Sequence, residues 1–291
     1  GIGPEGEPVP LRDEGILAAA GQYGVLPWMH LSSLTEEGRF SSGRAETLLK
    51  SSHRQEALLE QIKEILKEKG YGGVDVDFEY LQPGLAGAYT AFVELLRREL
   101  NELGYTVQVA LAPKVSRGQK GLLYESHDYA ALGRAANGAL LMTYEWGYNA
   151  GPPMAVAPLD KVRQVVDYAL GEIEAKKLFL GVPVYGYDWP LPYRQGVTRG
   201  VSVAPQEALD LARRQGAEIQ FDETAQAPWF RYTAADGREH EVWFEDARSS
   251  YAKFRLAAEK GLQGVGLWNL MRPAVQTYLV LHGGFEIEEV R

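Results

Sequence analysis

The chain contains no cysteine in its 291 residues. This absence excludes disulfide bonds, thiolate metal sites and cysteine nucleophiles, although it does not identify a cellular compartment. No apolar run reaches the length of a membrane-spanning helix, and no basic and apolar leader opens the sequence, so we expect any targeting segment to have been removed. No glycine-rich phosphate loop follows any candidate strand, which argues against an open nucleotide-binding sheet.

Basic residues are outnumbered: the chain has 30 Lys and Arg but 39 Asp and Glu, which gives a formal net charge of −9. Nucleic acids and anionic membranes are bound through basic patches, so this balance argues against both as partners. The chain does have an ordinary share of hydrophobic residues, 45%, which is enough for a large core. These numbers predict a globular protein whose ligand is neither nucleic acid nor a lipid surface.

Strand-like and helix-like segments alternate along most of the chain. Apolar runs predict strands, and apolar residues at spacings of three and four predict helices. The expected strands cover residues 24–33, 72–81, 105–113, 138–147, 177–186 and 264–270, and the expected helices cover 11–24, 54–70, 87–104, 128–137, 159–173, 247–261 and 274–284. This alternation is typical of an α/β protein with a parallel sheet covered by helices, either a barrel or an open doubly wound sheet.

The alternation breaks between residues 190 and 262. This segment predicts a helix, a strand and then a hairpin, whose turn is marked by the pair Asp236–Gly237. We therefore predict that residues 1–189 and 263–291 form a barrel and that residues 190–262 form a small α+β insertion before its last strand.

The segment YGGVDVDFEY, residues 71–80, places three acids at every second position. Side chains alternate between the two faces of a strand, so Asp75, Asp77 and Glu79 share one face and apolar residues share the other. In a barrel the acids point inward, where like charges and burial raise the pKa of at least one carboxyl, as a general acid requires. Glu79 lies nearest the C-terminal end of the strand, where barrels keep their active sites, and is the predicted proton donor.

Two other interpretations of the acid segment are open. It could be an edge strand with its acids in water, but the flanking Gly72 and Gly73 and the apolar opposite face do not fit that interpretation. It could also bind Mg²⁺ or Ca²⁺, since alternating carboxylates supply suitable oxygen ligands. No histidine or further acid clearly converges on the segment, so we predict no metal.

The stretch GGVDVDFE resembles the signature of glycoside hydrolase family 18, which lies on the fourth strand of a (β/α)8 barrel. Three later segments match in the same order: LMTYEWG (141–147) resembles the sixth-strand motif, GVPVYGYDW (181–189) the seventh and GVGLWNL (264–270) the eighth. The resemblance covers nearly the whole chain and implies a barrel of the TIM type.

Two stretches, MTYEWGYNAGPP and the hairpin followed by VWFEDARS, resemble the bacterial spore cortex-lytic and spore-germination branch of the family. That branch implies an N-acetylglucosaminidase that cleaves β-1,4 bonds in peptidoglycan at the cell envelope or spore cortex, outside the cytoplasm. It implies a glycan as the partner, with no cofactor, nucleic acid, membrane insertion or obligate protein partner. A chitinase of the same family and a catalytically silent lectin on the same barrel are the alternatives.

The resemblance also implies roles for four residues of a retaining, substrate-assisted reaction. Glu79 protonates the glycosidic oxygen, and the substrate's own acetamido oxygen attacks the sugar in place of an enzyme carboxylate. Asp77 holds the acetamido N–H and offsets the positive charge of the ring, and Asp75 shares a proton with Asp77. Tyr144 binds the acetamido carbonyl and fixes it for attack.

Several aromatic residues follow the predicted strands. Without the resemblance, Tyr144 on an apolar strand is more often a core tyrosine, and Trp268 could likewise belong to the core. With the resemblance, Trp268 is expected to stack under the sugar. Further substrate contacts are expected from Met142, Glu145, Trp146, Tyr185 and Tyr187, and Tyr148 and Trp189 lie at similar positions. Glu245, Asp246 and Arg248 could face the cleft or begin the next helix, and both interpretations are open.

The sequence departs from the family pattern in two ways. Gly72 stands where the family's leading Asp usually lies, and we expect activity to survive this change because that residue is mainly supporting. The strands also do not count to eight, since too few residues precede the strand at 24–33 for two earlier strands. We therefore expect that the N-terminal strands of the barrel are missing or incomplete in this chain.

Overall fold

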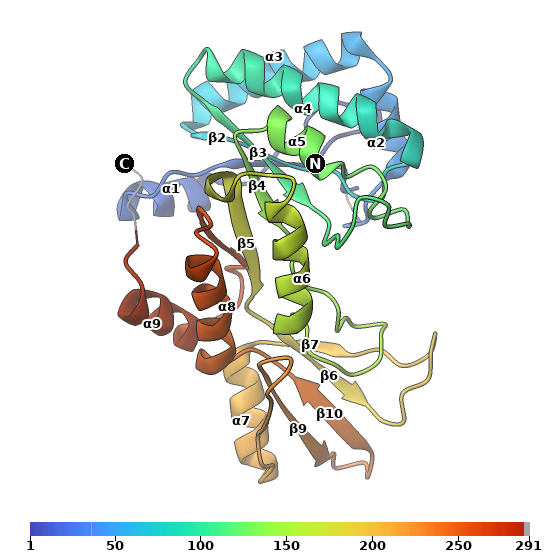
Figure 1. The fold of residues 1–291 in the computed structure, drawn as a ribbon, viewed down its shortest axis with the longest axis vertical. Coiled ribbons are helices and arrows are strands. Elements are labelled where there is room, and N and C mark those ends of the chain that lie inside the picture. Colours follow the sequence, from blue (N-terminus) through green and yellow to red (C-terminus); the bar gives the residue numbers. More distant parts are fainter. Residues whose placement is uncertain (36, 288–291) are drawn as a thin grey trace. The chain divides into compact units, whose positions relative to one another are not determined.

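The computed structural model describes residues 1–35 and 37–287, and the chain divides into two compact units (Figure 1). Unit 1 consists of Gly1–Leu141 and Tyr168–Leu178, and unit 2 consists of Met142–Asp167 and Phe179–Ile287. Each unit buries its own set of apolar side chains.

The described part of unit 1 contains parallel strands in the order β1-β2-β3-β4. They are β1 (Met29–Ser32), β2 (Gly73–Asp77), β3 (Thr106–Leu111) and β4 (Gly138–Leu141). The helices are α1 (Glu14–Tyr23), α2 (Ser42–Leu49), α3 (Ser52–Lys69), α4 (Ala86–Asn101) and α5 (Tyr129–Ala135), with 3₁₀ helices η1 (Pro83–Leu85) and η2 (Ala175–Lys177). Parallel pairing follows because helical crossovers return the chain to the start of each new strand.

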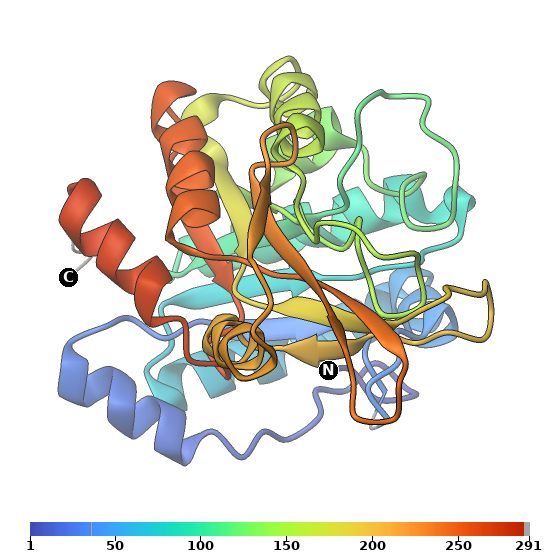
Figure 2. The same ribbon diagram turned by 90° about the horizontal axis from the view of Figure 1, so that it is seen from below.

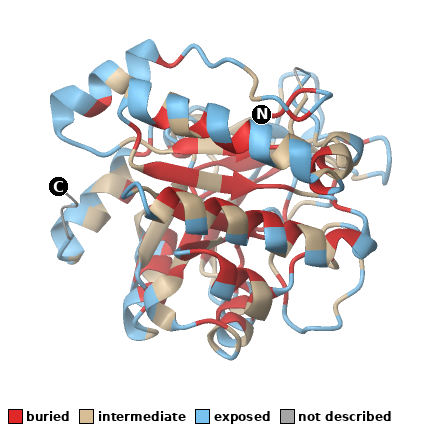
Figure 3. Cartoon of the chain, turned by 90° about the horizontal axis from the view of Figure 1, so that it is seen from above, coloured by how far each residue is buried: buried red, intermediate tan, exposed pale blue. Residues whose placement is uncertain are grey.

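Helix α3 of unit 1 begins and ends at capping residues. The side chain of Ser51 accepts the N–H of Arg54 at the start of α3, and Gly70 ends this helix with φ of +69°, a conformation that glycine adopts at little cost. In Figure 3 the strands are buried, whereas the helices expose their outer faces. Helix α4 buries one apolar face, made of Tyr89, Phe92, Val93, Leu96 and Leu100.

Unit 2 contains a parallel pair of strands and a separate antiparallel sheet. Strands β5 (Leu178–Pro183) and β11 (Gly264–Trp268) form the pair. The antiparallel sheet has the order β7-β6-β10-β9-β8, with β6 (Gly186–Pro190), β7 (Val201–Val203), β8 (Gln220–Asp222), β9 (Ala227–Thr233) and β10 (Glu239–Trp243). The helices are α6 (Leu159–Leu170), α7 (Pro205–Gln215), α8 (Ala247–Glu259) and α9 (Val275–Gly284).

The antiparallel sheet of unit 2 is built around the predicted hairpin. Strands β9 and β10 form its long arms, drawn in orange in Figure 2. Gly237 has φ of +82° in the connecting turn, as the Asp236–Gly237 signal predicts. Helix α7 packs on this sheet through a small core of Ala208, Ala212, Phe230, Val242 and Phe244.

Several strands are shorter than the sequence predicts. The strand expected over 72–81 ends at Asp77, and the one expected over 138–147 ends at Leu141, so Glu79 and Tyr144 lie in the segments that follow. Helix α2 and strands β6 and β7 were not predicted, because each is short and lacks a clear apolar period. Strand β6 begins before the predicted domain boundary at residue 190, and the boundary itself stays a prediction.

The described residues carry fewer than the eight parallel strands of a closed barrel, namely four in unit 1 and the pair β5 and β11 in unit 2. This agrees with the expected α/β fold of the TIM type with an incomplete set of strands. Among residues 1–35 and 37–287, no helix combines the length and the apolar character needed to cross a membrane.

Candidate active site

The predicted acids lie on β2 of unit 1 and directly after it. Asp75 and Asp77 belong to β2, and Glu79 is half-buried in the segment that follows. The Phe78 ring stacks on Tyr89 of α4, with ring centres 5.7 Å apart. The residues that alternate with the acids are fully buried: Val74, Val76 and Phe78. The strand therefore separates an apolar face from a carboxyl face, as its alternation predicts.

A histidine of the neighbouring strand contacts this carboxyl face. In the parallel register of β1 and β2, His30 lies opposite Asp75. The Nδ1 atom of His30 lies 2.9 Å from Oδ2 of Asp75, and its Nε2 atom lies 3.6 Å from Oδ2 of Asp77. The Oδ1 atoms of both acids are buried and have no hydrogen-bond partner within the part of the chain that the structure describes. Each acid thus keeps one buried oxygen whose hydrogen-bonding capacity the described residues leave unused.

The pKa values of Asp77 and His30 are both raised above their ordinary values, for different reasons. Burial is the main reason that the pKa of Asp77 rises from 3.8 to about 6, while the charge of His30 lowers it and that of Asp75 raises it. Burial lowers the pKa of His30, but its hydrogen bond with Asp75 and the charges of both acids raise it above the ordinary 6.5. The two acids thus favour the protonated imidazole, and the imidazole in turn favours the ionised form of Asp77.

The segment that carries Glu79 is held by a buried histidine on the next loop. The Nδ1 atom of His127 accepts the N–H of Ala112 at 2.9 Å, so Nε2 carries the ring proton and donates to the carbonyl of Phe78 at 3.0 Å. Burial lowers the pKa of His127 to about 4, which keeps it neutral in this role. The hydroxyl of Ser126 donates to the carbonyl of Gln82 at 2.7 Å. Glu79 therefore lies between two anchored carbonyls.

In unit 2 a second group gathers around Glu145. Its carboxylate accepts hydrogen bonds from the hydroxyls of Tyr185 at 2.5 Å and of Tyr187 at 3.0 Å. Burial raises the pKa of Glu145, and the two tyrosine hydroxyls act against that rise. Glu145 has φ of +67°, which is uncommon outside glycine and places it at a tight bend after β4. The structure therefore brings these three predicted substrate residues together.

The other predicted residues of unit 2 lie nearby in the chain. Tyr144 packs on the aromatic cluster formed by Val156, Tyr185, Tyr187 and Trp189. Met142 is buried, Trp146 is half-buried, and Trp268 ends β11 with 46% of its surface exposed. The acids belong to unit 1 and these residues to unit 2, so the joint role expected for them stays a prediction.

The comparison with known families decides which family this is, because the model of glycosyl hydrolases family 18 matches residues 35–272. The chain belongs to glycosyl hydrolases family 18. This family 18 chain is 45% identical over 252 residues to the cortical fragment-lytic enzyme of Bacillus subtilis (strain 168), a match that covers 87% of the chain and 58% of that relative. It is 34% identical over 278 residues to the Bacillus anthracis enzyme of the same name, covering 96% of the chain and 64% of the relative.

The family 18 chain also matches solved structures. The crystal structure of the Bacillus megaterium QM B1551 spore cortex-lytic enzyme SleL is similar with a TM-score of 0.92 and 40% identity, covering 98% of this chain and 65% of that one. The expected TIM-type α/β fold is confirmed by this likeness. The chain spans less than two thirds of the length of these relatives.

The residues after the hairpin of the family 18 chain have structural partners. Asp246 accepts the N–H groups of Arg248 and Ser249 and caps helix α8. Lys253 donates from Nζ to Oε2 of Glu245 at 2.7 Å, and both side chains are at most 1% exposed. Of the two open interpretations, the structure favours the helix start for Asp246.

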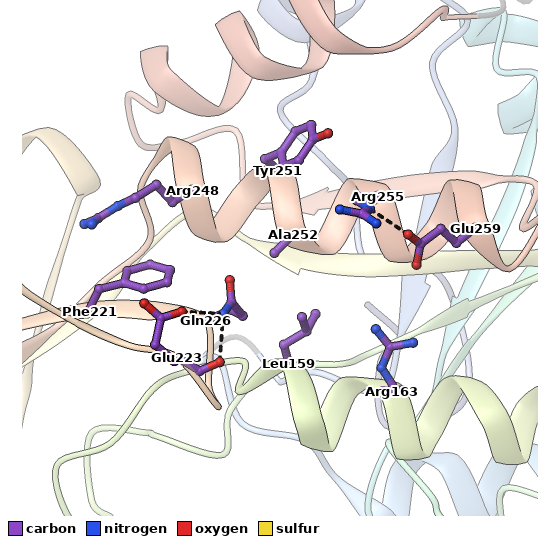
Figure 4. Close-up of a pocket in the computed structure, with 10 residues that line it drawn as sticks. All are labelled: Leu159, Arg163, Phe221, Glu223, Gln226, Arg248, Tyr251, Ala252, Arg255 and Glu259. Atoms are coloured by element: carbon purple, nitrogen blue, oxygen red, sulfur yellow. Dashed lines mark hydrogen bonds and ion pairs between the residues drawn. The ribbon is translucent and has the colours of Figure 1, made fainter.

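Unit 2 of the family 18 chain also has a cavity of about 590 Å³ beside α6, α8 and the turn between β8 and β9 (Figure 4). The guanidinium of Arg248 lies 4.3 Å from the ring centre of Phe221, and Arg255 pairs with Glu259. None of the predicted catalytic or substrate-binding residues lines this cavity.

Sequence reasoning missed both histidines that support the acids of unit 1. A signal for His30 was present, because it lies on the strand expected over 24–33. If that strand pairs with the acid-bearing strand, a histidine on one can lie beside an acid on the other. His127 gave no signal, since its partners are backbone groups. Within the described ranges, no group of three His, Asp or Glu residues is arranged to hold a metal ion.

Proposed function

We propose that this chain is a glycosidase that cleaves β-1,4 bonds of N-acetylglucosamine in peptidoglycan of the spore cortex type, with retention of configuration. Membership of family 18 and the cortical fragment-lytic relatives support this substrate class. The observation that carries the proposal is the carboxyl face of β2, where Asp77 is buried, has one oxygen without a partner among the described residues and has a pKa raised to about 6. The relatives are longer than this chain, so the statement that this chain has their activity is also part of the proposal.

Glu79, Asp77 and the substrate's acetamido group supply the chemistry. Glu79 gives its proton to the glycosidic oxygen as the bond from that oxygen to C1 breaks, and the acetamido oxygen of the same sugar bonds to C1, which gives an oxazolinium ion. Ionised Asp77 accepts the acetamido N–H and offsets the positive charge. The Glu79 carboxylate then takes a proton from water, and the water oxygen attacks C1. The bond between C1 and the acetamido oxygen breaks, which opens the oxazolinium ring and gives net retention at C1.

The remaining predicted residues position the sugar in this proposal. Asp75 shares a proton with Asp77, and the hydroxyl of Tyr144 binds the acetamido carbonyl. The half-exposed indole of Trp268 offers an apolar face to the pyranose. The walls and further subsites are assigned to Met142, Glu145, Trp146, Tyr185 and Tyr187.

The test is a digest of purified spore cortex peptidoglycan and of chitin by the purified chain, with the products identified by mass spectrometry. We expect new reducing ends at N-acetylglucosamine in the cortex digest, and the reaction is expected to continue in the presence of a metal chelator. The E79Q variant should give no products, whereas E94Q, an exposed glutamate on α4, serves as the matched control. Cleavage by E79Q at the wild-type rate would refute the mechanism.

The same digest separates the alternatives. If the chain cleaves chitin efficiently and does not cleave cortex peptidoglycan, it is a chitinase. A chitinase shares the chemistry and differs in the sugars that it accepts beside the scissile bond. Binding to either glycan without cleavage assigns a lectin. With cortex as substrate, the chain would act at the spore or cell envelope, outside the cytoplasm.

A further inference from the structure

His30 of β1 is a basic side chain in contact with the carboxyl face of β2. Its two ring nitrogens point to different acids, with Nδ1 at 2.9 Å from Asp75 and Nε2 at 3.6 Å from Asp77. The parallel register places His30 beside Asp75, so the backbone pairing of the two strands fixes this contact. An imidazole held in this way spans both carboxyls.

We propose that His30 is a positioning residue, which holds Asp75 and Asp77 through both ring nitrogens and stabilises their ionised forms. The effect of His30 on catalysis rests on the proposed function. The contact of His30 with the two acids does not. His30 acts through the two acids and is not assigned any contact with the substrate.

Packing alone does not account for His30. Its side chain is 41% exposed, unlike that of His127, which is buried with both ring nitrogens bonded to the backbone. Position 72, where the family has its leading Asp, offers Asp75 no side chain. A Cβ atom at Gly72 would lie 2.3 Å from the side chain of Leu26. The hydrogen-bond partner that the structure gives Asp75 is His30 of the neighbouring strand, at 2.9 Å.

The charges around the pair set the direction of its effect. His30 faces Asp75 and Asp77 on β2, and burial lowers its pKa while their charges raise it. Asp77 faces His30 and Asp75, with Tyr89 of α4 behind it and Glu79 two residues further along the chain. Burial raises the pKa of Tyr89 well above its ordinary value, so it stays neutral. His30 is thus the positive charge identified beside Asp77.

The first experiment measures the histidine directly. The chain has five histidines, and the NMR signal of the His30 ring is identified by its absence in H30N. In the wild-type chain its titration midpoint should lie above 6.5, and it should fall in D75N and, by less, in D77N, because Asp75 makes the shorter contact. A midpoint that is the same in all three proteins would overturn the inference, whatever the chain hydrolyses.

The second experiment follows kcat/KM against pH for H30N and H30Q, whose amide nitrogens lie near the positions of Nδ1 and Nε2. Removal of the cation should move the acid limb upward by about one pH unit, since an opposite charge at this range shifts a carboxyl by roughly 1–3 units. H53N, which changes an exposed histidine of α3, is the matched control. A uniform loss of rate with an unmoved acid limb would assign His30 a structural role only and overturn the inference.

The two experiments separate failure of this inference from failure of the proposed function. If the chain cleaves no glycan but the midpoint of His30 falls in D75N, the proposed function fails and the contact stands. If the chain cleaves glycan and the midpoint does not move, the proposed function stands and the role of His30 fails. Thermal unfolding of each variant identifies any that has lost its fold, and H30Q then replaces H30N.

Discussion

At the scale of single residues, Asp77 lies at the proposed site, and burial of its ionised carboxyl costs folding stability. It is 7% exposed at the end of β2, and its folded-state pKa of about 6 lies above 3.8. The folded protein therefore binds this proton more tightly than the unfolded chain does. The stability that follows is fully present below pH 3.8 and is lost as the pH rises through about 6. The ionised form that the proposed mechanism needs is thus the destabilised form.

We predict that D77N is more stable than the wild type at pH 8, by about 1–3 kcal/mol, because the amide removes a buried negative charge. At pH 3.5 the two proteins should have similar stability, since Asp77 is then protonated in both the folded and the unfolded state. Urea denaturation at the two pH values measures the difference. Lower stability of D77N at pH 8 would contradict the cause given for the raised pKa.

The catalytic roles proposed for Glu79 and Asp77 predict distinct kinetic losses. E79Q should lower kcat by about 10²–10⁴-fold, the usual contribution of a general acid, while the affinity for an N-acetylglucosamine oligomer changes little. D77N should cost more than tenfold, because the acetamido group loses the partner that orients it. Single-turnover rates and calorimetric binding separate the two effects, with E94Q as the control. A loss below tenfold in D77N would count against substrate assistance.

How much of the site could be read from the sequence also differs from residue to residue. The spacing of Asp75, Asp77 and Glu79 was enough to place two acids on one face, because strand alternation is a local rule. His30 lies 45 residues before Asp75, and its contact depends on the register between β1 and β2, which no local pattern reports. The partners of His127 are backbone groups, which carry no sequence signal at all.

At the scale of elements, helix α8 is fixed to unit 2 by a buried ion pair. Lys253 on α8 and Glu245 just before it are at most 1% exposed, and burial raises the pKa of Glu245 against the opposing charge of Lys253. The Oε1 atom of Glu245 has no partner among the described residues. A pair of this kind adds little net stability, but the loss of one partner leaves an isolated buried charge.

We predict that K253M destabilises the chain by about 3–5 kcal/mol at pH 7, because it leaves Glu245 buried and unpaired. The double variant E245L/K253M should recover much of this loss, since no charge then remains inside. K260M is the matched control: Lys260 pairs with the half-exposed Asp167 at the end of the same helix, and its loss should cost less than about 1 kcal/mol. Thermal and urea denaturation measure all three, and equal losses in K253M and K260M would refute the argument.

The sequence predicted whether a segment is a helix or a strand more reliably than it predicted the residues at which the segment ends. Helices α3 and α4 were expected because each has a long apolar period and a capping residue or glycine at its end. Strands β2 and β4 end earlier than their apolar runs, because hydrogen bonding to the neighbouring strand stops before the run does. Strand β6 was missed, since GYDWP has no period and ends in proline, although β10 pairs with it over four residues.

At the scale of the whole molecule, the chain is an acid-rich family 18 protein with a net charge of −9. Motif order was enough to predict the TIM-type fold, because four separate segments matched in sequence. The number of parallel strands could be predicted as well, since each corresponds to one apolar run between helical segments. The division into two compact units could not, because it depends on long-range contacts within each unit.

The net charge predicts how salt changes activity on a charged polymer. Peptidoglycan carries carboxylates on its peptides, so a chain of net charge −9 is repelled from it at low ionic strength. We expect kcat/KM on cortex fragments to rise severalfold between 10 and 150 mM NaCl, as the screening length falls from roughly 30 to 8 Å. A neutral N-acetylglucosamine oligomer is the control substrate and should show no such rise. Equal salt responses would rule out repulsion as the cause.

The cost of burying Asp77 has an evolutionary consequence. If Asp77 has its proposed role, a single change of that carboxyl to an amide would weaken turnover and, by the same physics, make the folded state more stable. Proteins that keep the sugar pocket and lose the chemistry would then be easy to reach from this scaffold, and only continued demand for the reaction holds the charge in place.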